Sequence, residues 1–131
     1  MNTKLNQILA EISAGELLDK ITILEIKREK ITDSEKLKNI NKELSSLTKT
    51  SDEKIPDKKR IEDLVSNLKK INLRLWDIEE NKRKAEKEKK FDNAFIQLSR
   101  DVYKSNDERA KIKLKINEIL GSNIKEVKSH Y

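Results

Sequence analysis

The sequence predicts an all-α fold, an antiparallel helical bundle or an extended helical hairpin of three to four main helices. Charged residues make up 41% of the chain and hydrophobic residues only 34%, too little apolar material for a thick globular core. The apolar residues nevertheless recur at helical spacing, and only two glycines and one proline interrupt the chain. Long helices in a thin bundle satisfy all of these observations.

A chain of 131 residues has room for one core, so we expect residues 1–131 to form a single helical domain. The main helices are predicted at about 14–32, 34–48, 58–90 and 92–120, with a loop at about 48–57. Thin bundles often complete their apolar burial by association, so we also expect a homodimer.

The first main helix has the clearest start. Ser13 and Glu16 form a capping box, and Ile12 and Leu17 can close a hydrophobic staple over the same turn. Apolar residues then follow on nearly all sides of the helix, which is typical of a central, buried helix. Before this helix, residues 1–11 form a short amphipathic lead that is expected to pack its single apolar stripe on the bundle.

Lys20, Thr22 and Glu25 lie between the apolar residues of this helix, so they need polar partners if the helix is central. Two interpretations remain open. The charged side chains either reach solvent or pair with a neighbouring helix for packing specificity, or they belong to a functional site.

The second helix is predicted after a break near Asp33, with Asp33 or Ser34 as its cap. In one uninterrupted helix its apolar residues would lie opposite the stripe of the first helix, so the alternative to a break is one long helix that changes neighbours halfway. These residues keep a three-four spacing: Leu37, Ile40, Leu44 and Leu47. Pro56 and the lack of apolar periodicity predict the loop that follows.

The last two helices carry long apolar seams. Residues 58–90 show a heptad seam that fades into a charged segment, with Trp76 beside the seam as an expected packing or interface residue. Asp92 can cap the final helix, and Gly121 is a good C-terminal stop. Ser105 and Arg109 interrupt the final seam where apolar residues are expected.

The polar residues that break the apolar pattern on the first and last helices form our candidate cluster. Its members are Glu16, Asp19, Lys20, Glu25, Arg100, Tyr103, Asn106, Asp107 and Arg109. If the two helices pack side by side, Arg109 is the natural partner of Glu25 or Asp19, because a guanidinium can bind a carboxylate bidentately. Catalytic residues are unknown from the sequence.

The absence of cysteine excludes a disulfide scaffold, a thiol nucleophile and a Cys-ligated metal. His130, near the terminus, is the one histidine, so we predict no metal site and no cofactor. No apolar run approaches the length of a membrane span, and the start of the chain lacks a secretory pattern. We therefore expect a cytoplasmic protein.

Two enzymatic alternatives can be constructed from the charges. Glu16-x-x-Asp19 with Glu79-Glu80 resembles, in spacing only, the carboxylate pairs that hold Mg²⁺ in all-helical nucleotide pyrophosphatases. A clamp of Lys20, Arg100 and Arg109 could hold a dicarboxylate, as in all-helical chorismate mutases. Ion pairing within the protein explains both sets, so we rank these Lys/Glu/Arg enzyme or ligand-binding functions below a non-enzymatic function.

The basic charge is concentrated in residues 82–90, KRKAEKEKK, which carry +4 of the total of +6. This segment supports a second alternative, binding of nucleic acid. Because the rest of the chain is almost neutral, we do not expect a nucleic acid as the principal partner.

Three stretches, SAGELLDKITILEIKREKI, LWDIEENKR and FDNAFIQLSRDVYKSNDERAKIKLKINEILGS, resemble an uncharacterised bacterial and phage all-helical domain family. The resemblance covers Ser13 to about Ser122 and implies no activity. It implies a setting alongside glycosyltransferases of surface-polysaccharide synthesis. The resemblance also picks out a set of residues that overlaps the candidate cluster: Ser13, Gly15, Glu16, Asp19, Lys20, Glu25, Trp76, Phe91, Arg100, Tyr103, Asn106, Asp107 and Arg109.

The sequence thus favours a small helical protein that acts as an interaction or assembly module, presents helix faces to a protein partner and could serve surface-polysaccharide synthesis. The heptad seam and the lack of a strong catalytic signature carry this prediction.

Overall fold

The computed structural model describes residues 4–129, so His130 lies outside the described residues. It confirms the predicted all-α class: within residues 4–129 there are four α-helices and no strand. The helices are α1 (Ala14–Lys30), α2 (Ser34–Lys54), α3 (Glu62–Glu88) and α4 (Asn93–Leu120), and a short 3₁₀ turn (Lys59–Ile61) precedes α3.

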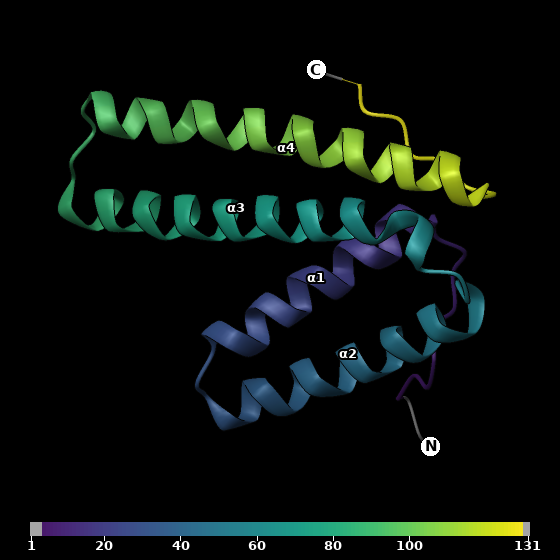
Figure 1. Cartoon of the computed structure of the whole chain (residues 1–131). Coiled ribbons are helices and arrows are strands. Elements are labelled where there is room, and N and C mark those ends of the chain that lie inside the picture. The colour runs from purple at the N-terminus through teal and green to yellow at the C-terminus, as the bar shows by residue number, and fades with distance from the viewer. Residues whose placement is uncertain (1–3, 130–131) are drawn as a thin grey trace.

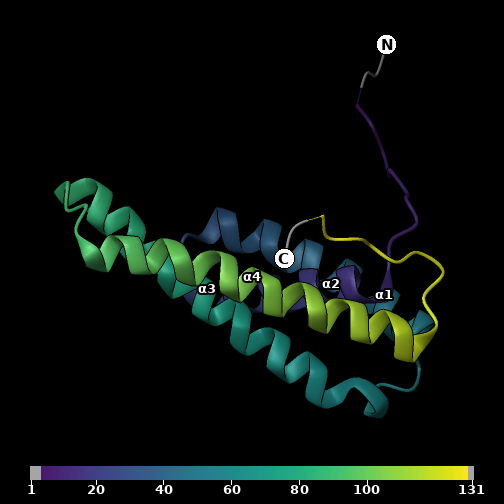
Figure 2. The ribbon, with the colours of Figure 1, turned by 90° about the horizontal axis from the view of Figure 1, so that it is seen from above.

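The helices form two antiparallel hairpins, α1–α2 and α3–α4 (Figure 1). Helix α1 contacts all three other helices, which makes it the central helix of the fold. It crosses α3 and α4 near its own N-terminus and then diverges from them, so the two hairpins form a wedge (Figures 1 and 2). The turn between α3 and α4 projects beyond the α1–α2 hairpin.

The apolar core is largest where α1 crosses the α3–α4 hairpin. Its buried members come from α1, the segment after α2, the 3₁₀ turn, α3 and α4: Leu17, Leu18, Ile55, Ile61, Leu68 and Ile116. A smaller core of Leu24, Ile40 and Leu44 joins α1 to α2. The larger core fixes the N-terminal half of α1 against the four other segments, and this junction holds the polar residues described below.

The helix ends follow local capping rules. The Ser13 hydroxyl accepts a hydrogen bond from the backbone N–H of Glu16 at 3.1 Å, as the capping box requires. Asp33 caps α2 by accepting from the N–H groups of Glu35 and Lys36, and Asp92 accepts from the N–H of Phe95. Gly121 ends α4 with a left-handed φ of 63°.

The predicted loop at 48–57 is wrong over most of its length, because α2 continues to Lys54. Ser51 and Ile55 extend the three-four spacing of α2, and both are buried. The sequence does not predict this part of the helix because Ser51 is polar and so interrupts the apolar pattern. Helix α2 ends at Lys54. The next residue, Ile55, precedes Pro56, and the ring of a proline disfavours the helical conformation of the residue before it. The third helix starts at Glu62 instead of residue 58, after the 3₁₀ turn.

The prediction of an amphipathic segment that packs on the bundle is also wrong over residues 4–12. Residues 4–12 are not helical, and Leu5, Ile8 and Leu9 are 79%, 78% and 86% exposed. A helix of two turns fixes many dihedral angles for few hydrogen bonds, so one apolar stripe is too little to stabilise it. Along residues 4–129, none of the helices combines the length and apolarity that a membrane crossing requires.

Candidate functional site

Asp19 is the centre of a buried polar cluster. Its side chain is on the second turn of α1, and the residue is 0% exposed. One carboxylate oxygen accepts from Arg109 Nε and from Asn72 Nδ2, both at 2.9 Å. The other accepts from Arg109 Nη2 at 2.5 Å, so the guanidinium binds Asp19 bidentately. Asp19 thereby ties α1 to α3 and α4. Of the two partners predicted for Arg109, Glu25 or Asp19, the structure has Asp19.

Thr22 completes the contact between α1 and α3. Asn72 Nδ2 lies 2.9 Å from Thr22 Oγ1 as well as from Asp19, and the Thr22 hydroxyl donates to the backbone carbonyl of Asp19 at 2.8 Å. Both Thr22 and Asn72 are buried. The polar groups of this contact therefore satisfy one another, as buried polar groups must.

Lys113 holds the second half of the cluster. Its ammonium lies 2.5 Å from Glu16, 3.7 Å from Glu126 and 3.9 Å from Asp19, while Lys20 pairs with Glu16 at 3.5 Å. Burial acts to raise the pKa of Glu16, but the hydrogen bond and the charge of Lys113 outweigh it, so the pKa is lowered. The hydrogen bond to Asp19 raises the pKa of Arg109. Glu16 and Arg109 are therefore both charged at neutral pH.

The N-terminus of α1 is closed by side chains. The N–H of Ala14 donates to Ser122 Oγ at 3.1 Å, that of Gly15 to Asn117 Oδ1 at 2.6 Å, and that of Glu16 to Ser13. A Cβ atom at Gly15 would lie 2.5 Å from the carbonyl oxygen of Lys113, so only glycine permits this approach of α1 to α4. These N–H groups are engaged by the protein itself and are not available to an anion.

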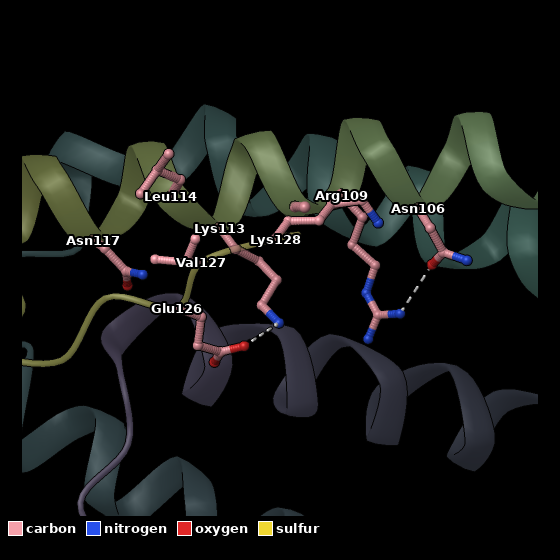
Figure 3. Close-up of a pocket in the computed structure, with 9 residues that line it drawn as sticks. Asn106, Arg109, Lys113, Leu114, Asn117, Glu126, Val127 and Lys128 are labelled. Carbon is pink, nitrogen blue, oxygen red and sulfur yellow. Dashed lines mark hydrogen bonds and ion pairs between the residues drawn. The ribbon is translucent and has the colours of Figure 1, made fainter. Parts of the chain in front are cut away.

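A hollow of about 350 Å³ lies between α4 and the segment after it. The side chains of Arg109 and Lys113 extend from α4 toward α1, and Glu126 approaches Lys113 from the other wall (Figure 3). Lys128 pairs with Asp107 at 3.3 Å, which holds the segment along α4. Each charged side chain that lines this hollow therefore already has an ion-pair partner within the protein.

A second hollow of about 460 Å³ lies in the wedge between α1 and α3, with Arg109 at its base. We call it the Trp76 cleft. Its walls are mainly apolar and its outer edge is charged; the lining residues are Ile23, Ile26, Asn72, Leu75, Trp76, Glu79, Glu80, Arg83 and Arg109. The indole N–H of Trp76 is buried and has no hydrogen-bond partner within residues 4–129. This donor is the exception to the pairing seen in the polar cluster.

The structure brings together part of the predicted cluster. Glu16, Asp19, Lys20 and Arg109 are connected, and Asn106 accepts from Arg109 Nη1 at 3.3 Å. The other four residues lie outside this network. Glu25 faces Lys69 at 3.9 Å, Asp107 faces Lys128, and Arg100 and Tyr103 are exposed.

Asn72, Lys113, Asn117 and Glu126 belong to the cluster but were not among the predicted residues. Asn72 had a usable signal, because it is a polar residue inside the apolar run of α3. Glu126 had none, since it lies in a polar, aperiodic segment.

Glu16 and Asp19, two of the carboxylates in the Mg²⁺-binding alternative, are engaged by cations of the protein itself. Both Asp19 oxygens accept hydrogen bonds from Arg109, and Glu16 is engaged by Lys113. In the described part of the chain, no group of three His, Cys, Asp or Glu side chains is placed to hold a metal ion. These acidic groups therefore stabilise helix contacts.

Comparison with known proteins gives a family and no activity. No curated protein matches the chain, and no solved structure does. One family model matches residues 8–131, which is nearly the whole chain and includes α1, the Trp76 cleft and the segment that carries Glu126. The chain therefore belongs to the family of unknown function DUF6165.

Proposed function

We propose that this chain is a non-enzymatic interaction and assembly module that binds a protein partner in the Trp76 cleft. The observation that carries the proposal is the contrast between the cleft and the polar cluster. Lys20 and Arg109, two residues of the dicarboxylate-binding alternative, each have an ion pair within the chain, and so does Glu25 of the candidate cluster. The cleft instead offers partly exposed apolar side chains, those of Ile23, Leu75 and Trp76.

The composition of the cleft fits an amphipathic helix as its occupant. Ile23, Leu75 and Trp76 are half-buried, so apolar side chains of a partner can cover them. Glu79, Glu80 and Arg83 are exposed at the edge of the cleft, where both signs of charge can select a partner. Apolar centres with polar rims, and tryptophan at the centre, are typical of protein interfaces.

We extend the proposal to a homodimer, in which the helix in the cleft belongs to a second copy of the chain. The resemblance of the sequence to bacterial and phage proteins supports a cytoplasmic role beside surface-polysaccharide synthesis, with an enzyme of that process as a further protein partner. A nucleic acid is not the partner that we propose.

The proposal can be tested with Trp76 itself, because it is the chain's one tryptophan. Light scattering should give twice the chain mass for the parent protein at tens of micromolar, and Trp76 emission should change on dilution. Trp76→Ala should be a monomer, whereas Trp76→Phe, which keeps an apolar ring and loses the N–H, should dissociate at an intermediate concentration. Tyr103→Ala removes an exposed aromatic side chain of α4 outside the cleft and should remain a dimer.

A monomeric parent protein would remove the homodimer and leave a different protein as the occupant. A photo-crosslinking amino acid at position 79 in the producing cells would then test the cleft, with position 103 as its control. A partner captured from position 79 should change Trp76 emission when the purified proteins are mixed. If nothing is captured specifically at position 79, or if the partner binds Trp76→Ala equally well, the proposal is wrong.

A further inference from the structure

The turn between α3 and α4 forms an exposed apex at one end of the molecule. We use this name for residues 82–96, which comprise the last turns of α3, the connection Lys89–Asp92 and the first turn of α4. The apex lies opposite the end where α1 begins and α4 finishes, and no other helix covers it (Figures 1 and 2). It is therefore free to meet a large surface end-on.

The positive charges of the apex are mostly not used within the protein. Lys84, Lys87 and Lys89 are exposed and have no ion-pair partner in the described residues, while Lys90 pairs with Glu88 at 3.6 Å in a solvent-exposed contact. Lys89 ends α3 with a φ of 55°, a conformation that favours glycine. The chain thus keeps a lysine at a position where it costs stability.

Apolar side chains lie next to these lysines. Phe91 is 54% exposed in the connection itself, and Ile96 is 48% exposed on the first turn of α4. Phe91 packs edge-on against Phe95, with their ring centroids 5.3 Å apart. This contact fixes the Phe91 ring at the outer end of the hairpin without covering it.

We propose that the apex binds the surface of a membrane that contains anionic lipids. Phe91 and Ile96 enter the headgroup region, and the unpaired lysines contact lipid phosphate and carboxylate groups. A cluster of lysines beside exposed apolar groups is the combination that such a surface selects, because the charges attract and the apolar groups anchor.

The same features fit a nucleic acid less well. Five of the six basic residues in 82–90 are lysines, which act as point charges and lack the planar fork with which arginine binds phosphates and bases. An exposed Phe91 and Ile96 at the outermost point also gain more from a lipid interface than from a duplex.

Binding of the full chain to vesicles tests this proposal. Sedimentation with vesicles of 70% phosphatidylcholine and 30% phosphatidylserine should capture the protein, and pure phosphatidylcholine should capture much less. The triple variant K84Q/K87Q/K89Q should lower the partition coefficient on the order of a hundredfold, and Phe91→Ser about tenfold. The matched variant K36Q/K38Q/K42Q removes three exposed charges from α2 and should bind like the parent protein.

A dye on a single introduced cysteine gives the orientation, because the chain has no cysteine of its own. An environment-sensitive dye at Asn93→Cys should shift to the blue on anionic vesicles, whereas the same dye at Glu43→Cys on α2 should not. The proposal fails if the protein does not bind anionic vesicles at low salt, or if the α2 variant loses as much vesicle binding as the apex variant. It also fails if the protein binds a polynucleotide more tightly than the vesicles and Phe91→Ser leaves the polynucleotide binding unchanged. None of these measurements depends on the Trp76 cleft.

Discussion

The Asp19 cluster and the apex are both rich in charged residues, but they use their charges in opposite ways. In the cluster, the carboxylates of α1 face the cations of α4, and Asp19 is 0% exposed. At the apex, lysines project into solvent beside an exposed phenylalanine. Charge density alone therefore does not locate function. Pairing and burial decide whether a charged group stabilises the fold or remains available to another molecule.

Removing a charge from each region tests this contrast most directly. Asp19→Asn leaves Arg109 partly buried without its carboxylate, so we expect the free energy of unfolding to fall by about 3–5 kcal/mol. Urea unfolding followed by circular dichroism measures this change. At the apex, K84Q/K87Q/K89Q should change the same quantity by less than about 0.5 kcal/mol, because exposed charges contribute little.

A small loss in Asp19→Asn, comparable to that of the apex variant, would mean that the cluster is not what holds α1 to α4. The variant Asp19→Leu with Arg109→Met provides a further check. It replaces the pair with apolar groups and should recover part of the lost stability, since no unpaired buried charge remains.

The second prediction concerns the close contact of α1 and α4 that brings Asp19 and Arg109 together. In Gly15→Ala, the new Cβ would meet the Lys113 carbonyl oxygen at 2.5 Å, which forces the helices apart. We expect a loss of about 1–3 kcal/mol in the free energy of unfolding. Urea unfolding of Gly15→Ala and Gly121→Ala measures the free energy of unfolding of both variants. The comparison separates the cost of a steric clash from the cost of an unfavourable backbone conformation.

Gly121 has open space around the position of a Cβ atom but a φ of +63°. Its replacement should cost about 1 kcal/mol, through the left-handed conformation alone. If Gly15→Ala costs no more than Gly121→Ala, the contact between α1 and α4 is more adaptable than its geometry indicates.

The sequence predicted well what depends on neighbouring residues. The Ser13 and Asp92 caps, the stop at Gly121 and the break near Asp33 are local signals, and each lies where it was expected. Ser51 shows the limit of such signals, because its burial comes from the contact of α2 with the core and its polarity hid the end of the helix.

Half of the polar cluster depends on how the helices cross. Arg109 was recognised because it interrupts an apolar seam, and Asp19 because it lies on a buried helix. Lys113 and Asn117 approach α1 only because Gly15 allows a close crossing of α1 and α4. The apolar spacing within α4 does not predict this crossing. Tyr103 shares a helical face with Asn106 and Asp107 but is exposed and lies outside the buried network.

The smallest predicted effect is a dependence on pH, and it comes from Glu16. Its pKa in the folded chain is lowered, so its ionised form stabilises the fold above the pKa of the unfolded chain, and this contribution is lost as the pH falls through the folded pKa. We expect the urea midpoint of the parent protein to decrease between about pH 5 and pH 3, and to decrease less steeply in Glu16→Gln. Glu88→Gln removes a solvent-exposed carboxylate from the apex and should keep the profile of the parent protein, because its contact with Lys90 is exposed. If the two variants have the same profile, Glu16 and Lys113 interact no more strongly than a surface pair, and the Asp19–Arg109 contact alone distinguishes the cluster from the apex.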